Sequence, residues 1–436
     1  PTYPIKRLSS ILPSETWPGS QRTGPPAFLH RATGVPPVFV RARFDPPPSI
    51  PDNPTMPKIP AARIVLLMPT WLGDAVMATP FLRALATLYP HAHIAAVARP
   101  LAAPVLAGLS YVQEVYLADR HNPAATARYL RTGRFDMGIA LPNAFRAAWS
   151  LFRARIPQRL GYARDWRAPL LTHTLTPQRR ALDQRSADLA KRLAIRQISR
   201  ELGRPQNPRI GSPYQPTPAI DYYLALAEYL GAHELSKHME LAITDEERAQ
   251  AAAALATLAI PSPTWVTLIP GANFGSSKCY PPEHFAAVAT TLIQKYGTSI
   301  LLAGSPAEAP ILQAIIEHAT TKATGVSPQH FLSLPALNHG QGIPLGALKE
   351  LIRRSKLVLC NDTGPRHFAA AFNVPTITLF GPTDPRWAET LHPNERILRV
   401  NVPCGPCQLK KCPIDHRCLR GLTPEMVLAA AAELLG

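Results

Sequence analysis

Lys356–Pro385, with the sequence KLVLCNDTGPRHFAAAFNVPTITLFGPTDP, decides the fold class of this chain. An apolar, β-branched run ends abruptly at Asn361–Gly364, an Ala-rich segment follows, and a second apolar run stops at Gly381–Asp384. Two apolar runs separated by a helical segment are typical of a strand–helix–strand unit in a parallel sheet. Ligands of such sheets bind beyond the carboxyl ends of the strands, so both polar turns are candidate binding loops.

The same alternation continues along most of the chain. Strands are predicted at 63–69, 94–98, 114–118, 136–141 and 264–270, and in SILLAG, KLVLCN and PTITLFG, with helical segments between them. The pattern weakens between about 165 and 218 and restarts at Leu241. We therefore predict an α/β protein with two Rossmann-like, doubly wound domains, at residues 61–235 and 236–436.

Composition limits the class of protein. The chain has 436 residues, enough for two domains, and no run of eighteen apolar residues that would span a membrane. Fifteen of its 49 prolines fall within residues 1–60, which we predict to be a disordered leader without the apolar core of a signal peptide. Six cysteines in a chain of this length do not indicate a secreted disulfide scaffold, so we predict a cytoplasmic protein.

Positive charge is concentrated in the middle of the chain. The net charge is +17, and residues 146–209 contain fifteen Lys and Arg but four Asp and Glu. This balance favours a polyanionic partner, which is a nucleic acid, an anionic lipid or a phosphorylated substrate. The alternative is a solvated basic face without a partner.

Three turns after predicted strands carry chemically useful side chains. In NDTGPRH these residues are Asp362, Thr363, Gly364 and His367; in PGANFGSSKCYPPEHF they are Ser276, Ser277 and Lys278; and in PTWLGDAVMATP the residue is Asp74. Hydroxyls, a lysine and free backbone N–H groups at such turns bind phosphates, and a carboxylate can act as a general base. The alternative for Asp74, Asp362 and Thr363 is helix capping.

Two negative observations narrow the chemistry. The chain has no Asp-x-Asp pair, which transferases that bind a nucleotide sugar through a divalent cation need, so we predict that no metal is required at the phosphates. It also has no GxGxxG, which argues against a dinucleotide-dependent oxidoreductase.

Taken together, RIVLLMPTWLGDAVMATPFLRAL, PGANFGSSKCYPPEHF, CNDTGPRHFAAAFNVPTITLFGPTDP and CGPCQLKKCPIDHRCL resemble the ADP-heptose:lipopolysaccharide heptosyltransferases of glycosyltransferase family 9, nearest to the heptosyltransferase II branch. The resemblance begins near Arg63 and runs to the C-terminus. It implies a GT-B fold, in which an N-terminal acceptor domain and a C-terminal donor domain face each other across a cleft. It also implies inverting transfer of heptose from ADP-heptose to the inner core of lipopolysaccharide, without a cofactor.

The resemblance also implies roles for individual residues. Asp74 matches the base that deprotonates the acceptor, and Lys278 matches the lysine beside the donor phosphates. The donor-binding positions are Ser276, Ser277, Asp362, Thr363, Gly364 and His367. Glu308 is left unassigned, because Pro306–Glu308 departs from the family pattern at the position where some members bind the ribose.

The acceptor implied by the resemblance is an anionic, lipid-linked glycan at the inner face of the cytoplasmic membrane, where the enzyme would be peripheral. Its candidate ligands are Arg99, Arg146, Arg164 and Arg167. Two alternatives stay open: a family member that uses another nucleotide sugar or surface glycan, and a basic nucleic-acid-binding protein, although no nucleic acid is expected. The oligomeric state is not predicted.

A cysteine-rich segment at 404–418 contains Cys404, Cys407, Cys412 and Cys418, with His416 between the last two. Such residues are typical zinc ligands, but the spacing after the first pair is tighter than in most zinc ribbons. Reduced structural thiols are therefore the main prediction and a zinc site is the alternative.

Overall fold

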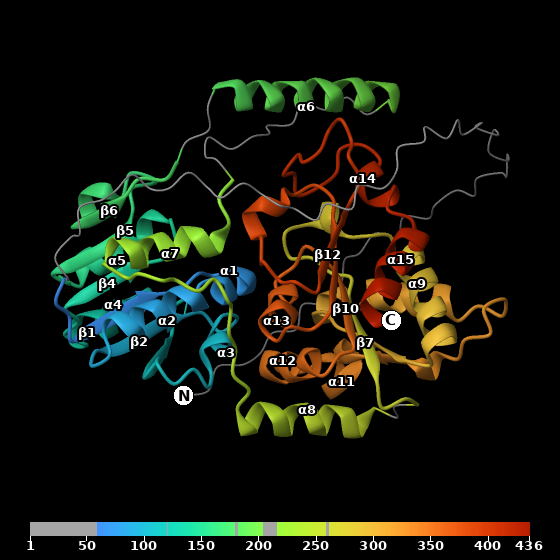
Figure 1. The fold of residues 1–436 in the computed structure, drawn as a ribbon, viewed down its shortest axis with the longest axis horizontal. Coiled ribbons are helices and arrows are strands. Elements are labelled where there is room, and N and C mark those ends of the chain that lie inside the picture. The colour runs from blue at the N-terminus through green and yellow to red at the C-terminus, as the bar shows by residue number, and fades with distance from the viewer. Residues whose placement is uncertain (1–58, 120, 179–181, 204–215, 259–260) are drawn as a thin grey trace, which may run out of the picture. The chain divides into compact units, whose positions relative to one another are not determined.

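Two six-stranded, wholly parallel sheets organise the chain (Figure 1). The computed structural model describes residues 59–436 except 120, 179–181, 204–215 and 259–260. The predicted leader at 1–60 lies almost entirely outside the described residues. The strand order is β3-β2-β1-β4-β5-β6 in the first sheet and β12-β11-β10-β7-β8-β9 in the second.

The elements of the first half are β1 (Arg63–Leu67), α1 (Leu72–Met77), α2 (Thr79–Leu88), β2 (His93–Ala98), α3 (Ala103–Leu106), β3 (Glu114–Leu117), α4 (Pro123–Thr132), β4 (Met137–Ala140), α5 (Phe145–Arg153), β5 (Gln158–Tyr162), η1 (Ala168–Leu170), β6 (His173–Leu175), α6 (Leu182–Glu201) and α7 (Ala219–Tyr229).

Those of the second half are α8 (Asp245–Thr257), β7 (Trp265–Ile269), η2 (Ser276–Lys278), α9 (Pro282–Tyr296), β8 (Ser299–Leu302), η3 (Pro306–Glu308), α10 (Ala309–Ala319), η4 (Pro328–His330), β9 (Phe331–Ser333), η5 (Leu334–Ala336), α11 (Leu337–Gly340), α12 (Leu345–Arg353), β10 (Leu357–Asn361), α13 (Arg366–Ala371), β11 (Thr376–Phe380), η6 (Pro385–Ala388), β12 (Glu395–Arg399), α14 (Arg417–Arg420) and α15 (Pro424–Leu435).

Both sheets have the strand order of a doubly wound nucleotide-binding fold. Counted from its own first strand, each sheet reads 3-2-1-4-5-6 or the reverse, so each half winds outward from a central strand in both directions. The order reverses between β1 and β4 in the first sheet and between β7 and β10 in the second. This confirms the predicted α/β class with two Rossmann-like sheets.

The central strands are buried on both faces, which explains their continuous apolar runs. Every residue of β7, β10 and β11 is buried, as expected for parallel strands covered by helices on each side. A single cluster of buried apolar side chains includes Ile64 and Leu66 of β1 as well as Val358 of β10 and Phe368 of α13. Side chains from both halves therefore share one core.

Short or polar strands escaped the sequence prediction. β5, β6, β9 and β12 contain arginine, histidine or serine and no long apolar run. β6, β9 and β12 are edge strands and β5 lies beside an edge, where polar residues are tolerated. The region where the pattern weakened contains α6, a helix of 20 residues. Its Leu, Ala, Arg and Gln content favours a helix even though its apolar periodicity is poor.

One further property bears on membranes. Among the helices of the described residues, none has the length and apolar character needed to cross a bilayer.

Candidate active site

The candidate site residues follow the strands that flank the two points of strand-order reversal. Asp74 follows β1, the Gly271–Lys278 loop follows β7, and Asp362 follows β10. Ligands of open α/β sheets bind at these positions because helices on opposite faces diverge there and leave space beyond the strand ends. The topology therefore places the three predicted turns where a ligand of each sheet is expected.

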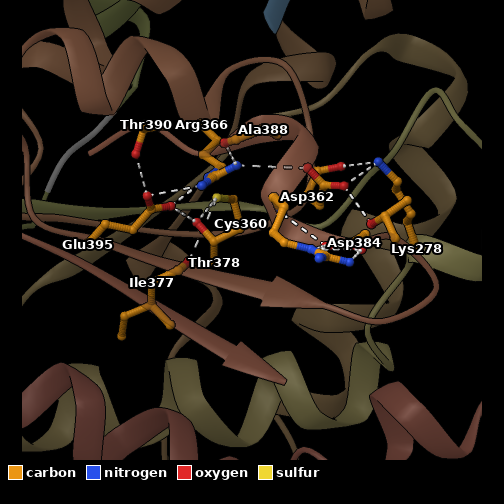
Figure 2. A network of polar contacts seen from close by, with 12 residues as sticks. Lys278, Cys360, Asp362, Arg366, Ile377, Thr378, Asp384, Ala388, Thr390 and Glu395 are labelled. Carbon is orange, nitrogen blue, oxygen red and sulfur yellow. Dashed lines mark hydrogen bonds and ion pairs between the residues drawn. The ribbon is translucent and has the colours of Figure 1, made fainter. Parts of the chain in front are cut away.

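Lys278 and Asp362 form a close ion pair (Figure 2). The Lys278 ammonium lies 2.5 Å from Asp362 Oδ2 and also donates to the Asp362 carbonyl at 3.1 Å. Burial alone would raise the pKa of Asp362, but the Lys278 and Arg366 charges outweigh it and lower that pKa. Asp362 accepts two of the three ammonium hydrogens, and the Phe274 ring centroid lies 4.8 Å from the Lys278 nitrogen, so a ligand would compete with this ring for the third hydrogen.

The two polar turns of Lys356–Pro385 meet at this pair. Thr383, in the turn after β11, donates its hydroxyl to Asp362 Oδ2 at 2.6 Å. Asn361, at the end of β10, donates to the Pro270 carbonyl at 2.5 Å and accepts from the backbone N–H of Tyr280. The turns after β7, β10 and β11 are thus tied together, because adjacent parallel strands end at the same edge.

A second buried ion pair supports the first. The Arg366 guanidinium binds both Glu395 oxygens, at 2.5 and 3.0 Å, and lies 4.0 Å from Asp362 Oδ1 (Figure 2). Thr378 and Thr390 also donate to Glu395, at 2.5 and 2.6 Å. Burial opposes ionisation of Glu395, yet Arg366 and these hydroxyls lower its pKa to about 2. Neither Arg366 nor Glu395 was predicted from the sequence.

Asp74 lies near the same pair from the other half of the chain. Burial raises its pKa to about 6; Lys278 lowers this pKa and Asp362 raises it, so both charges act on the Asp74 carboxylate. The residue that caps α1 is Trp71, whose side chain makes no cap hydrogen bond. Capping, the alternative for Asp74, is therefore wrong, as it is for Asp362 and Thr363, because no side chain caps α13.

Two glycines let α1 and α13 approach each other beside Asp74. A Cβ on Gly73 would lie 2.6 Å from His367 Cδ2, and one on Gly364 would lie 2.9 Å from Leu72 Cβ. His367 is buried, and burial lowers its pKa to about 3, so its ring is neutral. The imidazole packs at this junction, where it cannot supply a positive charge to a phosphate.

The hydroxyls of the loop after β7 differ in what they can contact. Ser276 is exposed, whereas Ser277 is buried and donates to the Leu409 carbonyl at 2.5 Å. The prediction that Ser277 binds the donor is not supported by this contact, which uses its only proton. Thr363 and Gly364 are partly exposed beside Asp362.

Glu308, which the sequence analysis left unassigned, lies against the start of this loop. Its Oε2 accepts from the Ser305 amide at 2.7 Å and from the Ser305 hydroxyl at 2.8 Å. A Cβ on Gly271 would lie 1.8 Å from Glu308 Oε1, so any other residue there would force this carboxylate to move. The signal available in the sequence was the capping box that begins at Ser305.

The predicted acceptor arginines lie in different environments. Arg146 is exposed at the start of α5, and Arg99 and Arg164 are partly exposed. Arg167 is fully buried and donates to the carbonyls of Tyr162 and Pro142. Because Arg167 links the ends of β4 and β5, its position does not support the prediction that it contacts an acceptor.

The four cysteines of the 404–418 segment line one small pocket with Pro413 and Ile414. Within the described residues, no group of three or more His, Cys, Asp or Glu side chains is arranged to hold a metal ion. Burial raises the pKa of Cys404 to about 11 and that of Cys418 to about 12, so both side chains are neutral thiols at pH 7 in the metal-free protein. This geometry does not support the zinc alternative.

Comparisons with known proteins agree with this architecture. The family model described as glycosyltransferase family 9 (heptosyltransferase) matches residues 181–417. The chain is 26% identical to lipooligosaccharide heptosyltransferase 2 of Haemophilus ducreyi, over 86% of this chain and 99% of that protein. It is also 26% identical to lipopolysaccharide heptosyltransferase 2 of Escherichia coli K12, over 86% of this chain and 98% of that protein.

Solved structures show the same fold. The ADP-heptose lipopolysaccharide heptosyltransferase II of E. coli has a TM-score of 0.64 at 24% identity, over 86% of this chain and 98% of that chain. A family 9 glycosyl transferase from Veillonella parvula has a TM-score of 0.64 at 22% identity, over 86% and 97%. The predicted GT-B fold is thereby confirmed. Because the family model spans more than half of its residues, this chain belongs to glycosyltransferase family 9, the heptosyltransferase family.

Proposed function

We propose that this enzyme transfers heptose from ADP-L-glycero-D-manno-heptose to the inner core of lipopolysaccharide, with inversion at the sugar C1. The observation that carries the proposal is that Asp74, with a pKa of about 6, lies within electrostatic reach of the Lys278–Asp362 pair. A base and a cation from different halves of the chain are what a reaction between an acceptor hydroxyl and a diphosphate leaving group requires.

Asp74 acts as the general base in this proposal. Its raised pKa lies just below neutral pH, so the carboxylate is ionised there and is still a stronger base than an ordinary aspartate. It accepts the proton of the acceptor hydroxyl while that oxygen attacks C1 from the face opposite the ADP.

Lys278 stabilises the departing diphosphate. Asp362 accepts two hydrogen bonds from its ammonium and holds it in place, and Thr383 in turn donates to Asp362. Such preorganised charge is effective because it needs no rearrangement as the leaving group becomes negative. Ser276, Thr363 and the Gly364 backbone complete the donor site, and Glu308 accepts a ribose hydroxyl of the ADP.

The two substrates bind to different halves of the chain in this proposal. We assign residues 61–235 to the acceptor and residues 236–436 to the donor, and we place the enzyme at the inner face of the cytoplasmic membrane. Arg99, Arg146 and Arg164 are the candidate contacts with the phosphates and carboxylates of the acceptor. The two heptosyltransferases compared above are named for lipooligosaccharide and lipopolysaccharide, which supports this acceptor.

Mass spectrometry of a heptosyl-Kdo-lipid A acceptor, after incubation with enzyme and ADP-heptose, tests the proposal directly. We expect the mass of one added heptose. No addition with ADP still bound tightly would leave the donor site in place and point to another nucleotide sugar or surface glycan. Absence of nucleotide binding would remove the proposed function altogether.

Replacing Lys278 by alanine is expected to lower the transfer rate by a factor on the order of 10² and to change its pH dependence. Transfer requires ionised Asp74, so the rate of the wild type should rise with pH and level off above about pH 6. Lys278 lowers the pKa of Asp74, so its loss should move this rise to higher pH.

The pH profile of kcat/KM for wild type, Lys278→Ala and Lys278→Arg is the measurement. The arginine variant keeps the charge, and its profile should stay close to that of the wild type. An alanine variant with an unmoved profile would mean that Lys278 does not act on Asp74.

A further inference from the structure

The outward face of α5 is aromatic, where a surface helix normally carries polar side chains. Its inward face contains Ala147, Ala148 and Leu151, which are buried. Phe145, Trp149 and Phe152 recur at helical spacing on the other face and are 47%, 43% and 43% exposed. We call these three side chains the α5 aromatic ridge.

The three rings of the ridge form one continuous strip. The ring centroids of Phe145 and Trp149 are 6.2 Å apart, and those of Trp149 and Phe152 are 5.8 Å apart. The ring planes are inclined by only 20° and 27°. An exposed strip of packed rings is not needed for the fold, because the opposite face of α5 already covers the sheet. Such strips mark interaction surfaces.

Arginines surround the ridge. The Arg153 guanidinium lies 5.8 Å from the Trp149 ring centroid, and that of Arg159 lies 5.7 Å from the Phe152 centroid. Arg146 and Arg155 are exposed on the same segment, and residues 145–159 contain no acidic side chain. The ridge is therefore an apolar strip within a region of positive charge.

The ridge begins at the edge of the sheet that carries Asp74. α5 starts shortly after β4, and β4 pairs in parallel with β1, which leads to α1. The carboxyl ends of both strands therefore lie at one edge. Trp166, which is 94% exposed, precedes η1, and η1 contacts α5. A surface to which the ridge binds would thus lie near the acceptor side of the site.

We propose that the α5 aromatic ridge and its arginines dock the enzyme on an anionic phospholipid bilayer. Aromatic rings are favoured at the boundary between headgroups and acyl chains, and arginines are attracted to the phosphates above it. This goes beyond the proposed function by naming the surface that meets the membrane. It rests on the proposed function in one respect, which is that an enzyme with a lipid-linked acceptor must reach the membrane.

A single-stranded nucleic acid is the other polyanion that arginines and aromatic rings bind. Bases stack on free ring faces, whereas the ridge rings already pack on one another and on Arg153 and Arg159. An arginine over the Trp149 ring and another over the Phe152 ring reduce the ring surface available for base stacking, and a packed apolar strip is better suited to an apolar boundary. The geometry therefore favours the bilayer.

Co-sedimentation with vesicles of phosphatidylethanolamine and phosphatidylglycerol tests the proposal, with vesicles of phosphatidylcholine for comparison. The wild type should bind the anionic vesicles, and the double variant Trp149→Ser/Phe152→Ser should bind them more weakly by about tenfold or more. Arg153→Glu should weaken binding as well and make the remainder less sensitive to salt. Leu391→Ala and Lys322→Glu, an exposed leucine and an exposed lysine of the other half, are the matched controls and should bind as the wild type does.

Fluorescence quenching locates the contact. Lipids brominated in the acyl chains should quench the tryptophan emission of the wild type more than that of Trp149→Phe, while Trp149→Phe still binds. Equal quenching of the two proteins, or equal vesicle binding by Trp149→Ser/Phe152→Ser and the wild type, would assign docking to another surface and overturn the proposal.

Three other outcomes would also overturn it. The first is that the wild type does not bind anionic vesicles. The second is that it binds random oligonucleotides through the ridge. The third is that it forms a dimer and the variant Trp149→Ser/Phe152→Ser is a monomer. Transfer to a detergent-dispersed acceptor separates this proposal from the proposed function. The ridge variants should transfer heptose to this dispersed acceptor as fast as the wild type does. If the wild type itself shows no transfer, the proposed function is contradicted but the docking surface is not.

Discussion

Replacement of Asp74 by alanine is expected to reduce heptosyl transfer by a factor on the order of 10²–10⁴, the usual contribution of a general base. Asp362, the other carboxylate that the structure describes beside Lys278, cannot take over, because Lys278, Arg366 and Thr383 hold it as an anion. Its low pKa makes it a poor base. Transfer to the heptosyl-Kdo-lipid A acceptor, measured by mass spectrometry under single-turnover conditions, gives the rate.

ADP affinity should survive the same change. The Asp74 carboxylate is close enough to Lys278 for each charge to affect the other, so it also repels a diphosphate bound there. Removing it should leave the ADP dissociation constant unchanged or lower it slightly. Calorimetric titration with ADP measures this constant, and equal loss of transfer and ADP binding would contradict the separate roles of Asp74 and Lys278.

Asp74→Asn is the isosteric control, and it should be inactive but more stable than the wild type. A carboxyl whose pKa is raised from 3.8 to about 6 favours folding while it is protonated, and that advantage is lost as pH rises through this interval. Above about pH 6 the ionised group costs up to about 3 kcal/mol, which asparagine avoids. The melting temperature of Asp74→Asn should therefore exceed that of the wild type at pH 7 but not near pH 4. An inactive variant that is also less stable at pH 7 would indicate a structural role.

The loops of the site followed from the sequence because they depend on topology. Alternating strands and helices predict parallel sheets, and parallel sheets bind ligands at known ends of known strands. The positions of Asp74, Lys278 and Asp362 after strands that flank a reversal of strand order were therefore predictable. Their pairing was not, because Lys278 and Asp362 are 84 residues apart and only the packing of β7 beside β10 brings them together.

The direction of individual side chains was harder to predict than their position. Ser277 and Arg167 occupy predicted segments, yet their polar groups turn inward to satisfy buried carbonyls. The buried face of α5 is also hard to predict from its sequence. Its aromatic stripe would be expected to face the core, but the structure buries the alanine stripe, which allows the helix to lie close to the sheet. Such choices depend on the space between elements, which local periodicity does not encode.

Glu395→Gln is expected to destabilise the protein by about 3–5 kcal/mol, because the Arg366 guanidinium would remain buried without a charged partner. Thr378 and Thr390 would also lose their carboxylate acceptor. In scanning calorimetry, this loss should lower the melting temperature by roughly 5 °C.

The double variant Arg366→Met/Glu395→Leu removes both charges. It therefore distinguishes the destabilisation caused by an unpaired buried charge from the net contribution of the ion pair to stability. Replacing a whole buried ion pair by apolar side chains is often nearly neutral, so most of the stability should return. ADP affinity should not return with it, because Arg366 lies 4.0 Å from Asp362 and helps to keep that carboxylate ionised beneath Lys278. The pair would then serve the donor site more than the fold. A double variant that binds ADP as tightly as the wild type would limit its role to stability, and a Glu395→Gln variant as stable as the wild type would mean that water reaches Arg366.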